Sequence, residues 1–149
     1  MKIREFIPND LKRVVEIEKI SFNQTYGENM FIKLFDIGAG FLVAEDNNYV
    51  VGYIIFWIKE EGIGHIISIA VDENYRRLKA GTELLKNAII LFKTCNMEKI
   101  TLEVNENNKG AIDFYKKFDF RVDRIVPGYY ENNQGAIVMY YDLVKAAKD

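Results

Sequence analysis

A cluster of basic residues lies where an apolar segment of the chain passes into a helical one. Arg76, Arg77 and Lys79 follow the apolar run of residues 66–71 and precede Gly81. The first turn of a helix leaves backbone N–H groups without intrahelical partners, and its dipole is positive at that end. With three cations beside it, such a turn is suited to binding a diphosphate. The same cations also fit an ordinary solvated helix start, and the residues alone do not separate the two interpretations.

Two common phosphate-binding motifs are missing from the sequence. No Gly-x-x-x-x-Gly-Lys run is present, which excludes a Walker loop. The pair Gly62 and Gly64 precedes the apolar run instead of following it, which excludes the dinucleotide-binding turn of a Rossmann fold. The basic turn is therefore neither of these motifs.

Length and composition limit the class of protein. The chain has 149 residues, 49% hydrophobic and 28% charged, with a formal net charge of -2, which predicts a single soluble domain over residues 1–149. One cysteine, Cys95, and one histidine, His65, exclude a disulfide framework and a Cys/His zinc site, and we expect no metal. The charge balance argues against a general nucleic-acid binder. No apolar run approaches the ~20 residues of a membrane span, and the absence of an export signal indicates a cytoplasmic protein.

The elements that must position the basic turn follow from the spacing of apolar residues. A period of two is typical of strands and a period near 3.6 of helices. We expect the order β-α-α-β-β-β-α-β-α-β-β, a mixed α/β fold in which residues 8–10 cap the first helix. Strands are predicted at residues 2–6, 41–44, 49–58, 65–71, 100–104, 120–126 and 136–143, and helices at 11–22, 30–35, 82–92 and 110–118.

The basic turn also resembles a known motif. Arg76-x-x-Lys79-x-Gly81, placed between a strand and a helix, resembles the Arg/Gln-x-x-Gly-x-Gly/Ala acetyl-CoA pyrophosphate loop of the GNAT acetyltransferase superfamily. The order of elements is also that of this superfamily. Further segments resemble its RimI and archaeal N-terminal acetyltransferase branch: residues 66–71 with 75–77, 102–104, Asn108, 111–115, 129–130 and 136–139.

The resemblance implies a fold, a cosubstrate and a set of binding residues. The fold is α/β (α+β), with a mixed, mostly antiparallel central sheet whose parted strands are flanked by helices. The cosubstrate is acetyl-CoA, whose thioester would be held by backbone amides near Ile69 and Val71, acting like an oxyanion hole. Asn108 would form a hydrogen bond with the pantetheine arm. The implied acetyl-CoA contacts are Ile69, Ala70, Val71, Arg76, Arg77, Leu78, Lys79, Ala80, Gly81, Thr82, Asn108 and Tyr115.

The chain departs from the family pattern at two positions. Lys79 replaces the first loop glycine, so the turn either uses an ordinary backbone conformation or holds the cofactor less tightly, while the lysine adds a charge near the diphosphate. Asp119 stands where relatives often have a glycine after the last helix. Since Asp tolerates a left-handed conformation better than most residues, we expect little effect on the fold.

The resemblance also implies the acid and the base of an acetyl transfer. Alternation alone makes Glu103 a surface carboxylate, whereas the family comparison makes it the base. A carboxylate titrating near ~4.3 is a weak base, so burial must raise its pKa or a water must relay the proton. His65 is the second candidate, since histidine ordinarily titrates near ~6.5, although a strand-end histidine bonded to a carbonyl fits equally well. Tyr115 would protonate the leaving thiolate, a mildly uphill transfer from ~10 to ~8.5.

The ordinary pKa values of amines also narrow the choice of acceptor. A protein α-amine titrates at ~7.7–8.0 and a lysine at ~10.4, so a site with one modest base favours the α-amine. Two pairs of aromatic residues would flank a protein or peptide N-terminus, ribosomal ones included: Phe22 with Tyr26, and Tyr129 with Tyr130. Core packing is the alternative for Phe22. The expected state is a monomer or a homodimer. Other hypotheses are acetylation of a polyamine, amino acid or aminoglycoside, and a CoA-binding module without catalysis. A Cys95–His65 nucleophile has no third residue to orient it.

Overall fold

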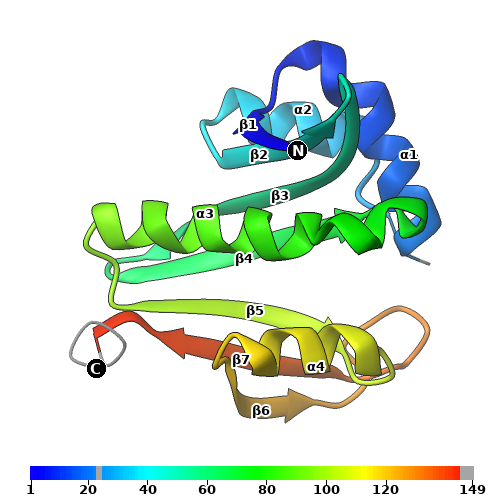
Figure 1. The fold of residues 1–149 in the computed structure, drawn as a ribbon. Helices are drawn as coiled ribbons and strands as arrows, with labels where there is room; N and C mark the ends of the chain where they lie inside the picture. Colours follow the sequence, from blue (N-terminus) through cyan, green and yellow to red (C-terminus); the bar gives the residue numbers. More distant parts are fainter. Residues whose placement is uncertain (23–24, 145–149) are drawn as a thin grey trace. The chain divides into compact units, whose positions relative to one another are not determined.

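The computed structural model describes residues 1–22 and 25–144, without the side chain of Arg77 (Figure 1). Its elements follow one another in the predicted order, with two short 3-10 helices added. The strands are β1 (Lys2–Glu5), β2 (Gly40–Asp46), β3 (Tyr49–Glu60), β4 (Ile63–Val71), β5 (Lys99–Asn105), β6 (Arg121–Val126) and β7 (Ala136–Asp142). The helices are η1 (Pro8–Asp10), α1 (Leu11–Ser21), α2 (Gly27–Asp36), η2 (Glu73–Leu78), α3 (Ala80–Thr94) and α4 (Lys109–Lys117).

The seven strands have the order β1-β2-β3-β4-β5-β7-β6. The pairing is mostly antiparallel, while β4 and β5 run parallel and pair residues 63–65 with 99–101. The chain forms two compact units, one of residues 1–57 and 66–91 and one of residues 58–65 and 92–149. The predicted mixed α/β sheet and its element order are confirmed.

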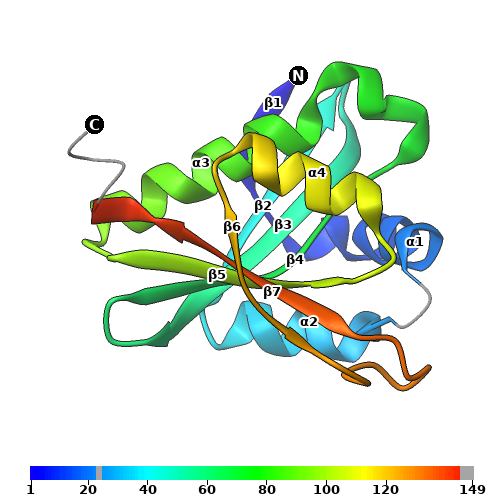
Figure 2. The same ribbon diagram turned by 90° about the horizontal axis from the view of Figure 1, so that it is seen from below.

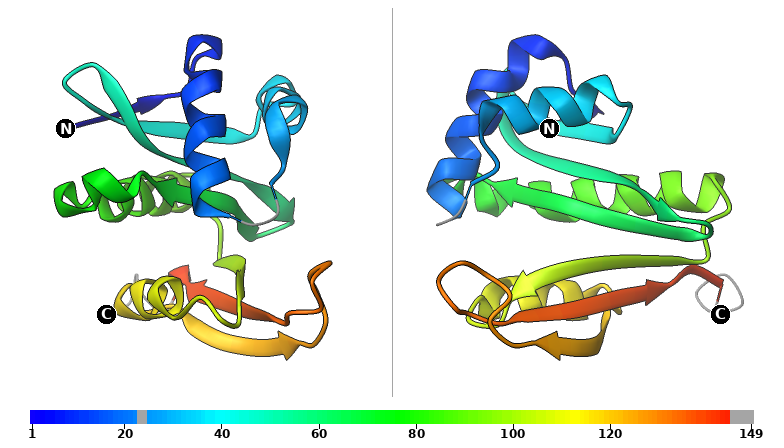
Figure 3. Two further views of the ribbon diagram at one scale, coloured as in Figure 1. Left: turned by 90° about the vertical axis from the view of Figure 1, so that its right-hand side faces the viewer. Right: turned by 180° about the vertical axis from the view of Figure 1, so that it is seen from behind.

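The first unit is built around an aromatic core. α3 lies on one face of its strands and α1 and α2 on the other (Figures 2 and 3). Phe6 stacks on Phe41 with ring centroids 3.9 Å apart, and Phe31 meets Tyr53 edge-on at 5.7 Å. On the opposite face, α3 approaches β3 so closely that a Cβ on Gly52 would lie 3.2 Å from a Leu84 methyl group. This packing fixes the start of α3, where the basic turn ends.

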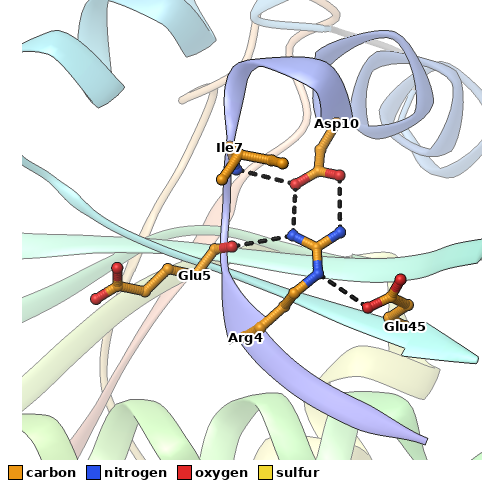
Figure 4. Close-up of polar contacts among 5 residues, drawn as sticks. All are labelled: Arg4, Glu5, Ile7, Asp10 and Glu45. Carbon is orange, nitrogen blue, oxygen red and sulfur yellow. Dashed lines mark hydrogen bonds and ion pairs between the residues drawn. The ribbon is translucent and has the colours of Figure 1, made fainter. Parts of the chain in front are cut away.

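An ion cluster joins the start of the chain to β2 (Figure 4). The guanidinium of Arg4 donates to both carboxylate oxygens of buried Asp10, at 2.8 and 2.9 Å, and to Glu45 at 2.9 Å. Asp10 also accepts the Ile7 backbone N–H at 2.9 Å. Asp10 was expected to cap α1, and it does hold the N-cap position, but its side chain makes no cap bond there because Arg4 and Ile7 occupy the carboxylate. A bidentate pair of this kind fixes the relative orientation of the two side chains and is stronger than a single hydrogen bond.

The second unit is a small sheet covered by one helix. β5 pairs with β7 and β7 with β6, and α4 lies to one side of them (Figure 3). Along β5, residues alternate between buried and half-exposed, so Ile100, Leu102 and Val104 face the core. α4 buries Ile112 and Tyr115. The helix is followed by Asp119 at φ 69, which confirms that aspartate takes the left-handed position expected of it.

Among the described residues, no helix is both long enough and apolar enough to cross a membrane.

Candidate functional site

A histidine of β4 and a glutamate of β5 meet on one face of the strands of the second unit. His65 Nε2 lies 3.1 Å from Glu103 Oε2. Both side chains come from the parallel β4–β5 pairing, in which His65 is opposite Thr101 and Glu103 stands two residues further along the same face. The His65 side chain is nearly buried, whereas a quarter of the Glu103 side chain is exposed. The carboxylate is thus the member of the pair that solvent or a substrate can reach.

The other ring nitrogen of the histidine is also occupied. His65 Nδ1 lies 2.8 Å from the hydroxyl of Thr101. The same hydroxyl has a longer contact of 3.5 Å to the carbonyl oxygen of Gly64. Gly64 itself has no room for a side chain, because a Cβ there would come within 2.3 Å of the Phe92 ring. Both nitrogens of the ring therefore have defined partners.

The surroundings of Glu103 favour its charged form. Hydrogen bonding to His65 lowers the pKa of this carboxyl below its ordinary value; burial opposes the shift, and the charges of His65, Lys59 and Arg124 add to it. The lowered pKa makes Glu103 a weaker base. The prediction from the sequence had required burial to raise this pKa, or a water to relay the proton. Of these two possibilities, the surroundings of Glu103 disfavour a carboxylate made basic by burial and favour a proton relay.

Arg124 reaches this face through an irregularity in β6. The β6–β7 register shifts between Val122 and Arg124, so Val122 is opposite Met139 and Arg124 is opposite Val138, leaving Asp123 as an extra residue. Val138 is in turn opposite Glu103. A β-bulge re-aims the side chains that follow it. Without the bulge, Asp123 would occupy this position and place a like charge near the carboxylate.

Two tyrosines follow β6 in a loop that is held at its far end. Gly135 N–H donates to Glu106 at 3.0 Å, and Tyr130 N–H donates to the Gln134 carbonyl at 3.0 Å. The rings of Tyr129 and Tyr130 meet edge-on at 5.0 Å. Tyr129 is 51% exposed, and partial burial together with the negative charge of Glu103 raises its pKa. This loop therefore places a phenol near the carboxylate.

Tyr115 lies on the opposite face of the strands from Glu103. Its ring packs on Phe120 at 5.7 Å, and Phe120 packs on Tyr141 at 5.3 Å. Tyr141 is opposite Ile100 on β5, one of the residues that alternate with Glu103. Burial, and to a lesser degree Tyr130, raises the pKa of Tyr115 well above that of an ordinary phenol. Full transfer of its proton to a thiolate is therefore more uphill than the sequence argument assumed.

The basic turn of the first unit keeps a left-handed residue. Lys79 ends η2 with φ 56 and ψ 35, the conformation that a glycine adopts easily. Lys79 N–H donates to the Arg76 carbonyl at 3.1 Å, and its own carbonyl accepts from Glu83 N–H at 3.2 Å. The ordinary backbone conformation allowed for in the sequence argument is therefore not the one adopted. Arg76 and Lys79 are exposed, and the side chain of Arg77 lies outside what the structure describes.

A buried carboxylate anchors the start of this turn. Asp72 caps η2 by accepting Asn74 N–H at 2.9 Å, and it forms an ion pair with Arg13 of α1. Arg13 also donates to the Val50 carbonyl at 2.7 Å and lies over the ring of Tyr49. The hydrogen bond from Arg13 lowers the pKa of Asp72, against the effect of burial. The turn is thus tied to both α1 and the start of β3.

The model of the acetyltransferase (GNAT) family matches residues 11–120. The chain belongs to this family. It is 34% identical over 152 residues to an N-alpha-acetyltransferase of Sulfolobus acidocaldarius, covering 93% of this chain and 90% of the relative. It is 30% identical over 144 residues to a putative [ribosomal protein bS18]-alanine N-acetyltransferase of Bacillus subtilis, covering 95% of each. The structure of Ard1 from Thermoplasma volcanium superimposes with a TM-score of 0.91 at 32% identity, covering 95% of this chain and 96% of that one.

Family membership makes the protein an acetyltransferase, and GNAT acetyltransferases use acetyl-CoA. Asn108, a predicted acetyl-CoA contact, lies in the second unit. Asn108 caps α4 by accepting Ala111 N–H at 3.1 Å, so its amide oxygen is used by the helix while its amide nitrogen carries donors the cap does not need. In the first unit, the predicted contacts run from the end of β4 through η2 into α3: Ile69, Ala70, Val71, Arg76, Leu78, Lys79, Ala80, Gly81 and Thr82.

The two residues of the first unit that were predicted to flank the acceptor peptide differ in exposure. Phe22 is partly buried against the core cluster, as the packing alternative expected. Tyr26 is half exposed at the N-cap of α2, and its backbone N–H donates to buried Glu18 at 2.9 Å. Asn23 and Gln24 of the same segment lie outside the described residues. Tyr26 therefore stays a candidate contact of the GNAT enzyme, positioned by Glu18.

Several residues that contact the predicted site residues were not predicted from the sequence. Thr101 had a usable signal, since it is two residues from Glu103 and a strand places both on one face. Asp72 and Arg13 are 59 positions apart and had none. Arg124 depends on the bulge in β6, which the alternation of its side chains does not indicate.

Lys79→Gly tests the left-handed turn of the acetyltransferase. This conformation costs an L-residue roughly 1–2 kcal/mol, and the extra freedom of glycine in the unfolded chain offsets part of the gain. We expect Lys79→Gly to unfold with a free energy about 0.5–1 kcal/mol higher than Lys79→Ala, measured by urea denaturation. Lys79→Ala removes the same charge but keeps the Cβ. Equal stability of the two variants would contradict the strained turn.

Proposed function

We propose that the protein transfers the acetyl group of acetyl-CoA to the N-terminal α-amino group of a protein or peptide, by direct attack in a ternary complex. The pairing of Glu103 with His65 at 3.1 Å is the observation that carries this proposal. The relatives named N-alpha-acetyltransferase and ribosomal protein alanine N-acetyltransferase support it.

The charge of Glu103 supports an α-amine as acceptor. Because the pKa of Glu103 is lowered, the carboxylate stays ionised at neutral pH and attracts a protonated amine. The same shift makes it a poor base for a lysine side chain, which titrates near ~10.4. An α-amine, near ~7.7–8.0, is partly neutral already and needs less help. Glu103, aligned by His65, then accepts the proton directly or through an ordered water.

The basic turn suits the cosubstrate in charge and backbone geometry. Exposed Arg76 and Lys79 provide cations, and the left-handed Lys79 lets the chain enter α3 with its N–H groups free of intrahelical partners. When bound, acetyl-CoA supplies an acetyl thioester, whose C–S bond breaks as the amine nitrogen bonds the carbonyl carbon, giving the N-acetyl amine and a free thiol. Backbone amides near Ile69 and Val71 are assigned to that carbonyl, and Asn108 to the pantetheine arm.

The positions of Glu103 and Tyr115 on opposite faces of β5 suit direct attack. The amine must lose a proton on one side of the reacting carbon, and the thiolate must gain a hydrogen bond on the other. Tyr129 and Tyr130, with Tyr26, are assigned to the acceptor peptide.

Tyr115→Phe measures how much the phenol contributes at the leaving group. Since burial keeps this phenol protonated, we expect it to act as a hydrogen-bond donor, and its loss to lower kcat about tenfold. A discontinuous assay of the thiol released from acetyl-CoA, at saturating peptide, gives kcat. Tyr141→Phe, which removes a hydroxyl from the same ring cluster, should leave turnover unchanged. Wild-type turnover in Tyr115→Phe would refute the role.

The proposed reaction is tested by the choice of acceptor. Thiol release from acetyl-CoA should be at least tenfold faster with peptides bearing a free N-terminus than with the same peptides blocked at the N-terminus but carrying lysine. Polyamines, amino acids and aminoglycosides serve as the competing acceptors. Faster turnover of a small amine would overturn the peptide assignment, and CoA binding without turnover of any amine would overturn the enzymatic one.

A further inference from the structure

The hydroxyl of Thr101 has two possible hydrogen-bond partners, and they suit different protonation states of His65. Nδ1 lies at 2.8 Å and the Gly64 carbonyl oxygen at 3.5 Å. A carbonyl oxygen only accepts, whereas a ring nitrogen accepts when it is bare and donates when it carries a proton. The direction of the Thr101–His65 bond is therefore set by the state of the ring.

The neutral state is fixed by Glu103. An ionised carboxylate only accepts, so the nitrogen 3.1 Å from it, Nε2, must carry the ring proton. Nδ1 is then bare and accepts from the Thr101 hydroxyl. When the ring gains a second proton, Nδ1–H donates to the Thr101 oxygen, and the hydroxyl proton turns to Gly64. A nearly buried ring keeps both nitrogens bonded in each state.

We propose that Thr101 is the positioning residue of His65, whose hydroxyl donates to Nδ1 of the neutral ring and accepts from Nδ1–H of the protonated ring. The charged and titratable groups around the pair come from three other elements: Lys59 of β3, Arg124 of β6 and Tyr129 of the β6–β7 loop. In the described part of the chain, the hydrogen-bond partner of Nδ1 is the Thr101 hydroxyl and none of these three groups, so this nitrogen depends on Thr101. The consequence for catalysis rests on the proposed function.

Because His65 is the chain's one histidine, nitrogen NMR of the whole protein labelled with 15N-histidine reports a single ring. In the wild type, the neutral ring should show a bare Nδ1 and a protonated Nε2. Thr101→Val keeps nearly the same shape without the hydroxyl. Since a hydrogen bond from a charged donor is about twice as strong as a neutral one, the titration midpoint should fall by about 0.5–1 pH unit. Thr101→Ser should restore it.

The outcomes separate this proposal from the proposed function. An unmoved midpoint in Thr101→Val, or a neutral ring protonated at Nδ1, overturns the role of Thr101. In the pH profile of kcat/KM for a peptide N-terminus, the acidic limb should move with the NMR midpoint in Thr101→Val. In Thr101→Ser it should go back to its wild-type position. A shifted midpoint with an unmoved limb supports the role of Thr101 at the ring and overturns the part of His65 in the proposed reaction. Thermal unfolding of each variant shows that the compared proteins are folded.

Discussion

Replacing Glu103 with glutamine should lower kcat for acetylation of a peptide N-terminus by a hundredfold or more. Removal of a general base typically costs 10²–10⁴ in rate. Glutamine has the same shape, and its amide oxygen still accepts from His65 Nε2, so the ring keeps its position while the negative charge is lost. The exposed quarter of the side chain is the part a substrate amine can reach. The loss should therefore fall on the chemical step and on attraction of the protonated amine.

Steady-state kinetics over a range of peptide concentrations measures this loss. Glu61→Gln, in the turn between β3 and β4, removes one exposed carboxylate from the same unit and should keep wild-type kcat. A loss of less than threefold in Glu103→Gln would transfer the role to His65 or to a water. A hundredfold loss in both variants would instead indicate a general effect of charge.

The fold was predictable because its apolar residues keep clean periods. In β5, Ile100, Leu102 and Val104 alternate with half-exposed residues, and all three are buried as alternation predicts. The ends of elements were less predictable. β3 extends to Glu60 through two charged residues that the apolar pattern does not mark, and α3 begins at Ala80, two residues before the first residue of its predicted range. Asp10 shows a further limit, since Arg4, six positions earlier on β1, binds the carboxylate that the local sequence assigns to a cap.

The candidate site was predictable only in part, and the reason is physical. His65 and Glu103 were weighed as alternative bases because 38 residues separate them along the chain, whereas parallel pairing of β4 and β5 makes them one unit. The direction of the Glu103 pKa shift could not be predicted from the sequence either. It depends on His65, Lys59 and Arg124 arriving from three strands, one of them re-aimed by a bulge. Burial alone, the argument available from the strand pattern, gives the opposite sign.

Asp72→Ala should lower the free energy of unfolding by about 2–3 kcal/mol, the range expected when a partly buried charged hydrogen-bond pair loses one member. Arg13 keeps the Val50 carbonyl and the Tyr49 ring, so the loss should stay below that of a fully orphaned buried charge. Asn74 N–H loses its acceptor, and η2 loses its N-cap. Urea denaturation at pH 7 measures the change. Asp36→Ala, which removes an exposed carboxylate from the same unit, should change stability by less than about 0.5 kcal/mol.

The pH dependence of Asp72→Ala distinguishes an ion pair from simple packing. The pKa of Asp72 is lowered in the folded protein, so its contribution is present above the unfolded value of ~3.9 and disappears as pH falls through the folded value. The stability gap between wild type and Asp72→Ala should therefore be full at pH 7 and shrink as the pH falls below about 4. A gap that stays constant would assign the loss to packing. Since Asp72 holds the first residues of η2, the variant should also raise the KM for acetyl-CoA several-fold, whereas Asp36→Ala should not.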